Sequence, residues 1–222
     1  MRCSGRCLHL VGKPLIIASR VNSFLGIRYA VAPIGDLRWK APVPIEHSKT
    51  GNGSDYVEAT TYGPQCVQAT PGYRLAPSDP NLASEDCLLL NVLTPSKPAL
   101  NLLPVVVNIH GGGYIGGNST SEDGTQLVSY SNGSIIYLSI QYRLGAYGFL
   151  AGSAIFEDGD LNAGLLDQRL ALEWVQEHIE AFGGDPKQVT IWGGSAGGGS
   201  VLYQLIRGGG EVNPPFRAAI PG

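Results

Sequence analysis

Short apolar runs are the clearest pattern in the chain. Val105 to Ile109 and Ser134 to Ile140 are apolar nearly throughout, which is typical of strands buried on both faces of a sheet. Val189 to Trp192 has the same character. Shorter strands are predicted within 23–30 and 88–93 because β-branched and aliphatic residues gather there between turn residues. These segments together predict a central sheet.

Helical spacing appears between the later strands. Apolar residues recur along one broad face from about Leu165 to Phe182, and Gly183 and Pro186 stop the pattern. A second apolar helical segment runs over 201–206. Strands separated by helices or long crossover segments favour a mainly parallel α/β sheet flanked by helices over a β-sandwich.

A Gly-x-Ser-x-Gly pentapeptide, Gly193 to Gly197, follows the last predicted strand directly and precedes the last helix. A serine in such a strand-to-helix turn has strained backbone angles, and small neighbours let the flanking segments approach closely. The start of the helix also offers N–H groups to developing negative charge. Ser195 is therefore the candidate nucleophile, although a plain glycine loop or a phosphate cradle would have a similar composition.

A second glycine motif, His110 to Tyr114, follows the strand at Val105. Its three consecutive glycines allow backbone N–H groups to turn toward one point, which is the geometry that holds an oxyanion without a cationic side chain. A flexible loop is the alternative. Ligand sites of parallel sheets lie at the carboxyl ends of the strands, and both glycine motifs are predicted there.

Composition excludes several function classes. With 222 residues and 43% hydrophobic content, the chain is long enough for one large domain or two small ones. A net charge of -3 and the lack of basic runs give no case for nucleic-acid binding. The apolar runs are too short for a transmembrane segment, and the first residues contain no convincing signal-peptide core.

Four cysteines are too few for a disulfide scaffold. Cys66 and Cys87 flank a polar, proline-rich stretch, where a bridge would join a long loop to the body, although two buried free thiols fit as well. Cys3 and Cys7 have no partners at metal-ligand spacing. Sequons begin at Asn52, Asn118 and Asn132, but one or two are expected by chance, so they favour secretion only slightly.

Eight segments occur in the order found in one family. They are 24–30, 37–39, 84–92, 110–114, 141–145, 164–168, 182–186 and 193–197. The sequence resembles the type-B carboxylesterases, the cholinesterase-like and fungal lipase-like branch of the α/β-hydrolases, over about residues 23 to 220. The resemblance implies an irregular N-terminal segment over 1–22 and the N-terminal part of a single α/β-hydrolase domain over 23–222.

The resemblance also implies roles for individual residues. Ser195 matches the nucleophile, and the backbone N–H groups of Gly112, Gly113 and Ala196 match the oxyanion hole. Cys66 and Cys87 match a disulfide. The matching structural ion pairs are Arg38 with Glu85 and Arg143 with Asp167. The implied reaction is hydrolysis of a small-molecule ester or a lipid through an acyl-enzyme, and it needs no metal or organic cofactor.

The chain departs from the family at the catalytic base. In this fold the acid and the histidine follow the serine, yet the residues after Ser195 contain one acidic residue, Glu211, and no histidine. His110 is expected behind the oxyanion loop, and His178 on the outer side of a helix. We therefore expect a chain cut short after the helix that follows Ser195. It should be inactive and poorly soluble, with an exposed sheet edge beside the strand at Val189.

Two further points stay open at this level. A catalytically inactive binding or adhesion module is the alternative to an esterase. A site that has lost catalysis, however, has no physical need for Ser195 and the glycines around it. Lipase and soluble-ester esterase are not distinguished, and neither is the oligomeric state. A second departure is Gly194, where many family members have glutamate.

Overall fold

The computed structural model describes residues 9–11, 13–14, 21–45, 56–69, 82–97 and 100–222. Within these residues the helices are α1 (Gly124–Tyr130), α2 (Gly145–Phe149), α3 (Ser153–Asp158), α4 (Ala163–His178) and α5 (Ala196–Ile206), with the 3-10 helices η1 (Gly35–Leu37), η3 (Ile179–Phe182) and η4 (Arg207–Gly209). The strands are β1 (His9–Val11), β2 (Lys13–Pro14), β3 (Val21–Arg28), β4 (Tyr56–Glu58), β5 (Gln65–Cys66), β6 (Ala83–Ser84), β7 (Leu89–Pro95), β8 (Leu103–Ile109), β9 (Ile136–Ile140), β10 (Gly184–Gly193) and β11 (Ala218–Pro221).

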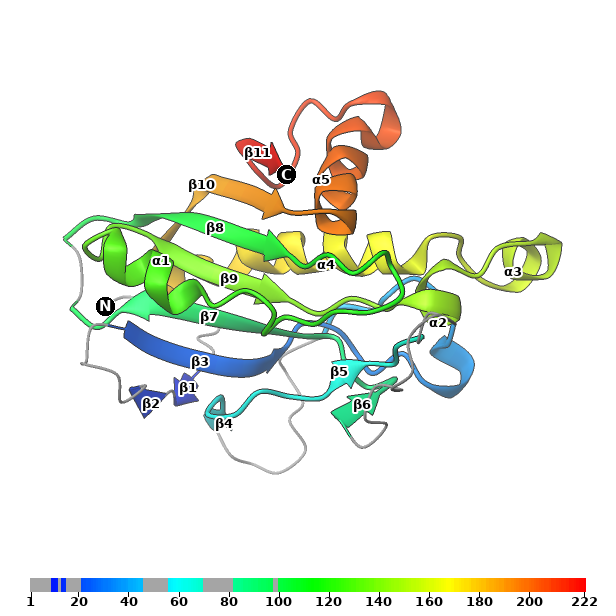
Figure 1. Ribbon diagram of the computed structural model, residues 1–222, viewed down its shortest axis with the longest axis horizontal. Helices are drawn as coiled ribbons and strands as arrows, with labels where there is room; N and C mark the ends of the chain where they lie inside the picture. The colour runs from blue at the N-terminus through cyan, green and yellow to red at the C-terminus, as the bar shows by residue number, and fades with distance from the viewer. Residues whose placement is uncertain (1–8, 12, 15–20, 46–55, 70–81, 98–99) are drawn as a thin grey trace.

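A mixed sheet forms the centre of the molecule (Figure 1). Its strand order is β11-β10-β8-β9-β7-β3-β2. β11, β10, β8 and β9 pair in parallel, whereas β7, β3 and β2 join through antiparallel pairs. Most strands, β3 included, therefore point the same way. The carboxyl ends of β8 and β10, where the two glycine motifs begin, meet at one edge.

Alternate side chains of the strands go to opposite faces of the sheet. On β8, Val105 and Val107 join the main core with side chains from α4 and α5. Val106 lies on the other face, with Val128 of α1 and with Trp192. Helices thus cover both faces, as the expected α/β architecture requires (Figure 1).

The predicted elements are present, with shifted ends. The predicted helix over 165–182 is α4 followed by η3, and Gly183, at φ 86°, ends it in a left-handed conformation. The last strand begins at Gly184 instead of Val189, with an irregularity in register between them. The last helix starts directly after Ser195.

Two expectations need correction. The N-terminal segment is not irregular throughout, because β1 pairs with β4, β2 pairs with β3, and β3 begins at Val21. The remaining residues of 1–20 lie outside the described residues, and the division at residue 22 stays a prediction. The edge beside β10 is also not open, because β11 pairs with it from Thr190 to Gly193. β11 itself has no outer partner among the described strands.

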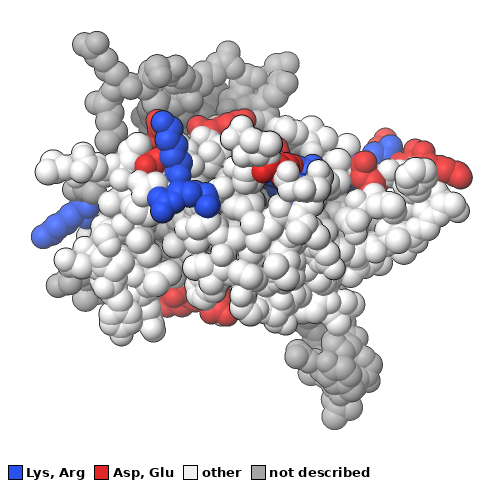
Figure 2. All heavy atoms as spheres, turned by 90° about the horizontal axis from the view of Figure 1, so that it is seen from above, with Lys and Arg blue, Asp and Glu red and all other residues white. Residues whose placement is uncertain are grey.

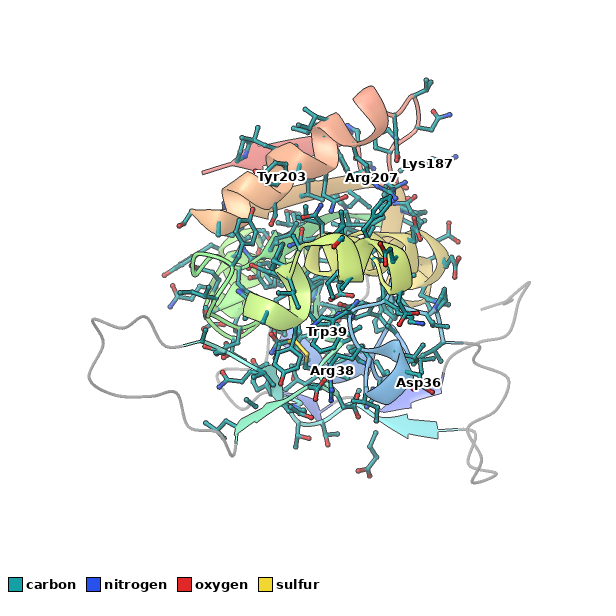
Figure 3. The ribbon with its side chains drawn as sticks, turned by 90° about the vertical axis from the view of Figure 1, so that its right-hand side faces the viewer. Asp36, Arg38, Trp39, Lys187, Tyr203 and Arg207 are labelled. Carbon is teal, nitrogen blue, oxygen red and sulfur yellow. A yellow bond between two sulfur atoms is a disulfide. The ribbon has the colours of Figure 1, made fainter. Side chains whose placement is uncertain are left out.

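An apolar surface lies over α5 and β11. Leu202, Tyr203, Ile206 and Ile220 are each more than half exposed. Figure 2, which views this side, shows few charged side chains over its centre, and Figure 3 labels Tyr203 on α5 and Arg207 at the start of η4. No helix among the described residues is both long and apolar enough to span a bilayer.

Candidate active site

Ser195 occupies the sharp turn between β10 and α5. Its φ of 56° and ψ of -124° lie in a region that non-glycine residues rarely adopt. The turn is held by backbone hydrogen bonds from Ser195 N to Gly222 O, at 2.9 Å, and from Gly197 N to Gly194 O, at 2.9 Å. Ser195 is exposed, and its hydroxyl has no hydrogen-bond partner among the described residues. The strained turn therefore presents an unengaged hydroxyl.

The glycines beside Ser195 are required by lack of space. A Cβ on Gly197 would lie 2.0 Å from the carbonyl oxygen of Ile109, and one on Gly193 would lie 2.5 Å from the backbone of Gly197. Real Cβ atoms do not approach backbone atoms so closely. Gly194 differs, since a Cβ there would meet nothing within 4 Å. The Gly-x-Ser-x-Gly pattern thus reflects close packing at its two outer positions only.

The glycine loop after β8 lies directly beside this turn. A Cβ on Gly111 would be 2.7 Å from Gly194 O and 3.3 Å from Ser195 Cβ. Gly112 and Gly113 follow with φ of 112° and 64°, and Tyr114 also has a positive φ, 61°. The two motifs that the sequence places at one sheet edge are therefore in contact.

The N–H groups of the proposed oxyanion hole are unengaged. Gly112 uses its carbonyl oxygen to accept from Ile115 N at 3.1 Å and from Gly116 N at 3.0 Å. The N–H groups of Gly112, Gly113 and Ala196 donate to no acceptor in the part of the chain that the structure describes. Ala196 is also the first residue of α5, where the helix dipole favours negative charge. Such donors suit an oxyanion.

His110 supports the glycine loop from within the core. Its side chain is buried, its Nδ1 lies 2.8 Å from Gly111 O, and its ring stacks on Tyr142 with centroids 4.4 Å apart. Burial lowers the pKa of His110 to about 4, despite the opposing effect of the Gly111 carbonyl. A neutral ring then donates from Nδ1 to Gly111. The expectation that His110 stands behind the loop agrees with this position.

A buried polar chain, which sequence reasoning missed, joins this loop to the helices. Gln168 Nε2 donates to Ser200 Oγ at 2.9 Å, and Ser200 Oγ donates to the Tyr114 hydroxyl at 3.3 Å. Gln168 and Ser200 are fully buried on α4 and α5. Part of the signal was available, since Gln168 lies on the apolar face of the helix predicted over 165–182, whereas Ser200 precedes the predicted segment 201–206. These two hydrogen bonds fix how the Tyr114 side chain lies against α5.

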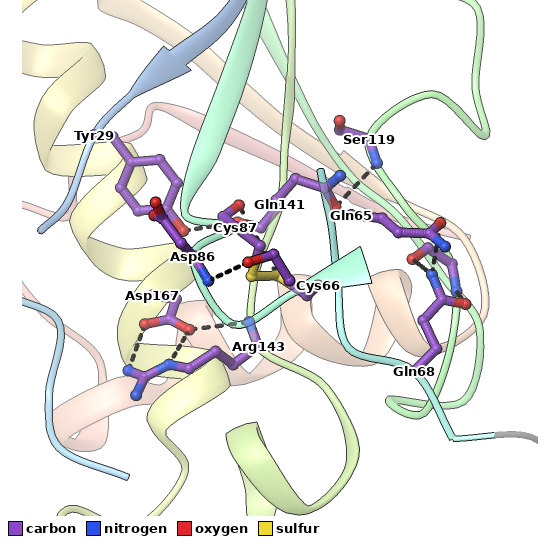
Figure 4. Close-up of a disulfide and its surroundings, with 12 residues drawn as sticks. Tyr29, Gln65, Cys66, Gln68, Asp86, Cys87, Ser119, Gln141, Arg143 and Asp167 are labelled. Atoms are coloured by element: carbon purple, nitrogen blue, oxygen red, sulfur yellow. Dashed lines mark hydrogen bonds and ion pairs between the residues drawn. A yellow bond between two sulfur atoms is a disulfide. The ribbon is translucent and has the colours of Figure 1, made fainter. Parts of the chain in front are cut away.

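A disulfide joins Cys66 to Cys87, which resolves the alternative of free thiols (Figure 4). Both cysteines are buried.

Next to them, Arg38 makes a two-point contact with Glu85, at 2.5 and 2.7 Å. The Arg38 side chain is 36% exposed and the Glu85 side chain 21%, so this ion pair is half-buried. A small pocket lies beside the disulfide, between Pro33, Leu144 and Tyr147.

Arg143 and Asp167 form the fully buried pair. Asp167 accepts from the Arg143 backbone N–H at 3.0 Å, from Nε at 2.8 Å and from Nη2 at 2.7 Å (Figure 4). Arg143 Nη2 also donates to the Lys40 carbonyl, at 2.8 Å. The pair thus joins the segment after β9 to α4 and to the loop around Lys40.

The other groups that could assist Ser195 are engaged elsewhere. Glu211 contacts Arg169 at 2.7 Å and Arg207 at 3.2 Å. His178 packs on Trp174 at the end of α4 and is 20% exposed, so it is partly buried rather than on the outer side. Because η3 and all of β10 separate it from Ser195, His178 lies near the opposite end of that strand. No three or more metal-binding side chains gather among the described residues.

Comparison with known proteins gives consistent matches. The sequence profile of the Carboxylesterase family matches residues 8–221. Lipase 4 of Diutina rugosa is 43% identical over 224 residues, covering 90% of this chain and 40% of the lipase. Secreted lipase 1 of Botryotinia fuckeliana (strain B05.10) is 40% identical over 211 residues, covering 86% and 36%. The crystal structure of Aspergillus niger EstA superposes with a TM-score of 0.84 at 43% identity, covering 96% of this chain and 39% of that one. The chain spans about two fifths of the length of these proteins.

Proposed function

The chain belongs to the carboxylesterase family of α/β-hydrolases, and we propose that it carries the nucleophile and the oxyanion hole of a serine carboxylic ester hydrolase. The observation that carries this proposal is the exposed, strained Ser195 in contact with a loop whose N–H groups are unengaged. The substrate class is a small-molecule ester or a lipid ester.

The proposed reaction is acyl transfer in two steps. Ser195 Oγ attacks the ester carbonyl, and the N–H groups of Gly112, Gly113 and Ala196 hold the negatively charged oxygen. The bond to the alcohol breaks, and the alcohol leaves with a proton. Water then attacks the acyl-serine and releases the acid. Loss of one such donor typically costs about 10²–10³ in rate.

A general base is needed for the attack, and the part of the chain that the structure describes does not supply one near Ser195. His110 is buried behind the glycine loop, and Glu211 is paired with two arginines. We therefore propose that these residues by themselves do not turn over esters, and that the base and its acid come from polypeptide outside them.

Secretion is part of the same proposal. Its support is the disulfide between Cys66 and Cys87, because disulfides persist in oxidising compartments. The similarity to a secreted lipase agrees with it.

The test is ester hydrolysis by the product of the complete coding sequence. The transcript is read past the codon for Gly222, the encoded protein is purified, and release of p-nitrophenol from p-nitrophenyl butyrate is measured. We expect turnover that Ser195→Ala abolishes, and none from residues 1–222 alone. Turnover that persists in Ser195→Ala would contradict the assignment of the nucleophile. If the complete protein folds but hydrolyses no ester, the inactive binding module becomes the better account.

A further inference from the structure

The turn between α1 and β9 presents an asparagine side chain to solvent. Asn132 is exposed and has a φ of 56°, and Gly133 follows with a φ of 74°. Their backbone N–H groups donate to Ser129 O at 3.2 Å and to Val128 O at 3.3 Å. The side-chain amide of Asn132 has no hydrogen-bond partner among the described residues. Its Nδ2 is therefore accessible and unengaged.

The turn is held by its serines rather than by Asn132. Ser131 Oγ donates to Val128 O at 2.8 Å and accepts from Ser134 N at 3.2 Å. Ser134 Oγ donates to Ser131 O at 2.6 Å. A group attached to Asn132 would break none of these bonds. Asn132-Gly133-Ser134 also has the Asn-x-Ser sequence that oligosaccharide transfer requires.

The sequon at Asn118 is in the opposite situation. Asn118 Nδ2 donates to Gln65 Oε1 at 3.0 Å, and its Oδ1 accepts from Thr120 N at 2.9 Å and from Thr120 Oγ1 at 2.6 Å. The next residue, Ser119, is 6% exposed. A sugar on Asn118 would have to fit at a partly buried, hydrogen-bonded site.

An exposed aromatic ring lies two residues before Asn132. Tyr130 is 84% exposed although it ends a helix whose Val128 is fully buried. The C–H-bearing face of a pyranose can pack on such a ring, because the face of the ring is electron-rich. Tyr130 would therefore offer such a face two residues from a sugar on Asn132.

From these features we infer that Asn132 is a site of N-linked glycosylation and that Asn118 stays unmodified in the folded protein. The donor is an oligosaccharide on a lipid pyrophosphate. Asn132 Nδ2 bonds to the anomeric carbon of the first N-acetylglucosamine, the bond from that carbon to the phosphate oxygen breaks, and the lipid pyrophosphate leaves with the electron pair. One Nδ2 proton passes to a base on the transferring enzyme.

The glycan would not obstruct the candidate active site. Asn132 precedes the amino end of β9, whereas Ser195 follows the carboxyl end of β10, and these strands run in the same direction within one sheet. The inference depends on the proposed secretion and is independent of the chemistry of Ser195.

The experiment maps the modified asparagine. Residues 1–222 are expressed in yeast behind a cleavable secretory leader, and material with a closed Cys66–Cys87 bond is selected, since that bond shows that the chain reached an oxidising compartment. Peptide N-glycosidase F in H₂¹⁸O converts each glycosylated asparagine to ¹⁸O-labelled aspartate, which peptide mass spectrometry locates. A digest without the enzyme corrects for spontaneous deamidation, to which an Asn-Gly pair is prone.

We expect ¹⁸O at position 132 and none above the control at position 118. Ser134→Ala should remove the label, whereas Ser129→Ala, which changes a serine outside the sequon, should keep it. Ser195→Ala should also keep it, so that failure of the esterase mechanism is distinguishable. An unlabelled position 132 in disulfide-closed protein, or a label at 118 with 132 bare, would overturn the inference.

Discussion

Around Ser195, glycines without side chains let backbone segments pack closely. A second region of the molecule is instead held together by bonds between side chains. Gly193, Gly197 and Gly111 leave no room for a Cβ, and Ser195 itself is strained. The second region, which we call the loop anchor, consists of Arg38, Cys66, Glu85, Cys87, Arg143 and Asp167, joined by a disulfide and two ion pairs. The turn at Ser195 is thus formed by closely packed backbone, whereas the loop anchor is held by bonds between side chains. Adding an atom should damage the first region, and removing one should damage the second.

The largest effect is expected in the loop anchor, at its buried ion pair. Asp167→Asn leaves the Arg143 guanidinium without a counter-charge at a site where the two side chains are 0% and 3% exposed. Breaking a buried pair on one side costs about 3–5 kcal/mol, so urea denaturation should show a loss of that size. The half-buried Arg38–Glu85 pair should matter less and depend more on salt. A loss below about 1 kcal/mol in Asp167→Asn would show that the pair is not a principal support.

The disulfide comes next. The bridged cysteines are 21 residues apart, so opening their loop should cost about 3 kcal/mol by the chain-entropy relation. Cys66→Ser should lower the free energy of unfolding by about this amount. Unmodified protein unfolded in reductant should match the variant, and a variant of unchanged stability would contradict a stabilising role.

A pH-dependent effect is expected at His110, which lies behind the glycine loop of the first region. Because the folded-state pKa is about 4 and the ordinary value is 6.5, the unfolded chain binds the extra proton between these values. Stability is therefore lost as the pH falls from about 6.5 toward about 4, by about 3 kcal/mol in total. Denaturation curves of the original protein and of His110→Gln should diverge over this window. Parallel pH profiles would contradict a buried, neutral His110.

The smallest effects separate the glycines of the turn. Gly197→Ala places a Cβ 2.0 Å from Ile109 O and should cost about 1–3 kcal/mol, with loss of esterase activity in the complete protein. Gly194→Ala is the matched control, since its Cβ meets nothing within 4 Å, and its stability should stay within about 0.5 kcal/mol. Equal effects of the two substitutions on thermal denaturation would show that close packing does not explain the motif.

Much of this arrangement could be read from the sequence because it depends on local patterns. The buried strands β8 and β9 are continuous apolar runs, and the glycine motifs stand directly at strand ends. The short helices α1 to α3 were not predicted, since they are too short for helical spacing to emerge. β11 has no clear strand pattern of its own, because its four residues include a proline and are mostly exposed.

Long-range polar contacts were beyond local patterns altogether. Gln168 and Ser200 are 32 residues apart, and Ser200 and Tyr114 are 86 apart, so no spacing rule connects them. The ion pairs were expected only from the family resemblance, and the residue pattern alone left the disulfide open beside two free thiols. Their residues come from segments far apart in the sequence, such as Cys66 on β5 and Asp167 on α4, and only the folded chain brings them together.

Covalent labelling tests the central claim, that the turn at Ser195 holds the nucleophile, most directly. The product of the complete coding sequence is treated with a fluorophosphonate, and the modified residue is located by peptide mass spectrometry. The account predicts a single adduct on Ser195, absent from Ser195→Ala and absent after unfolding in urea. An adduct on another residue, with ester turnover retained in Ser195→Ala, would contradict it.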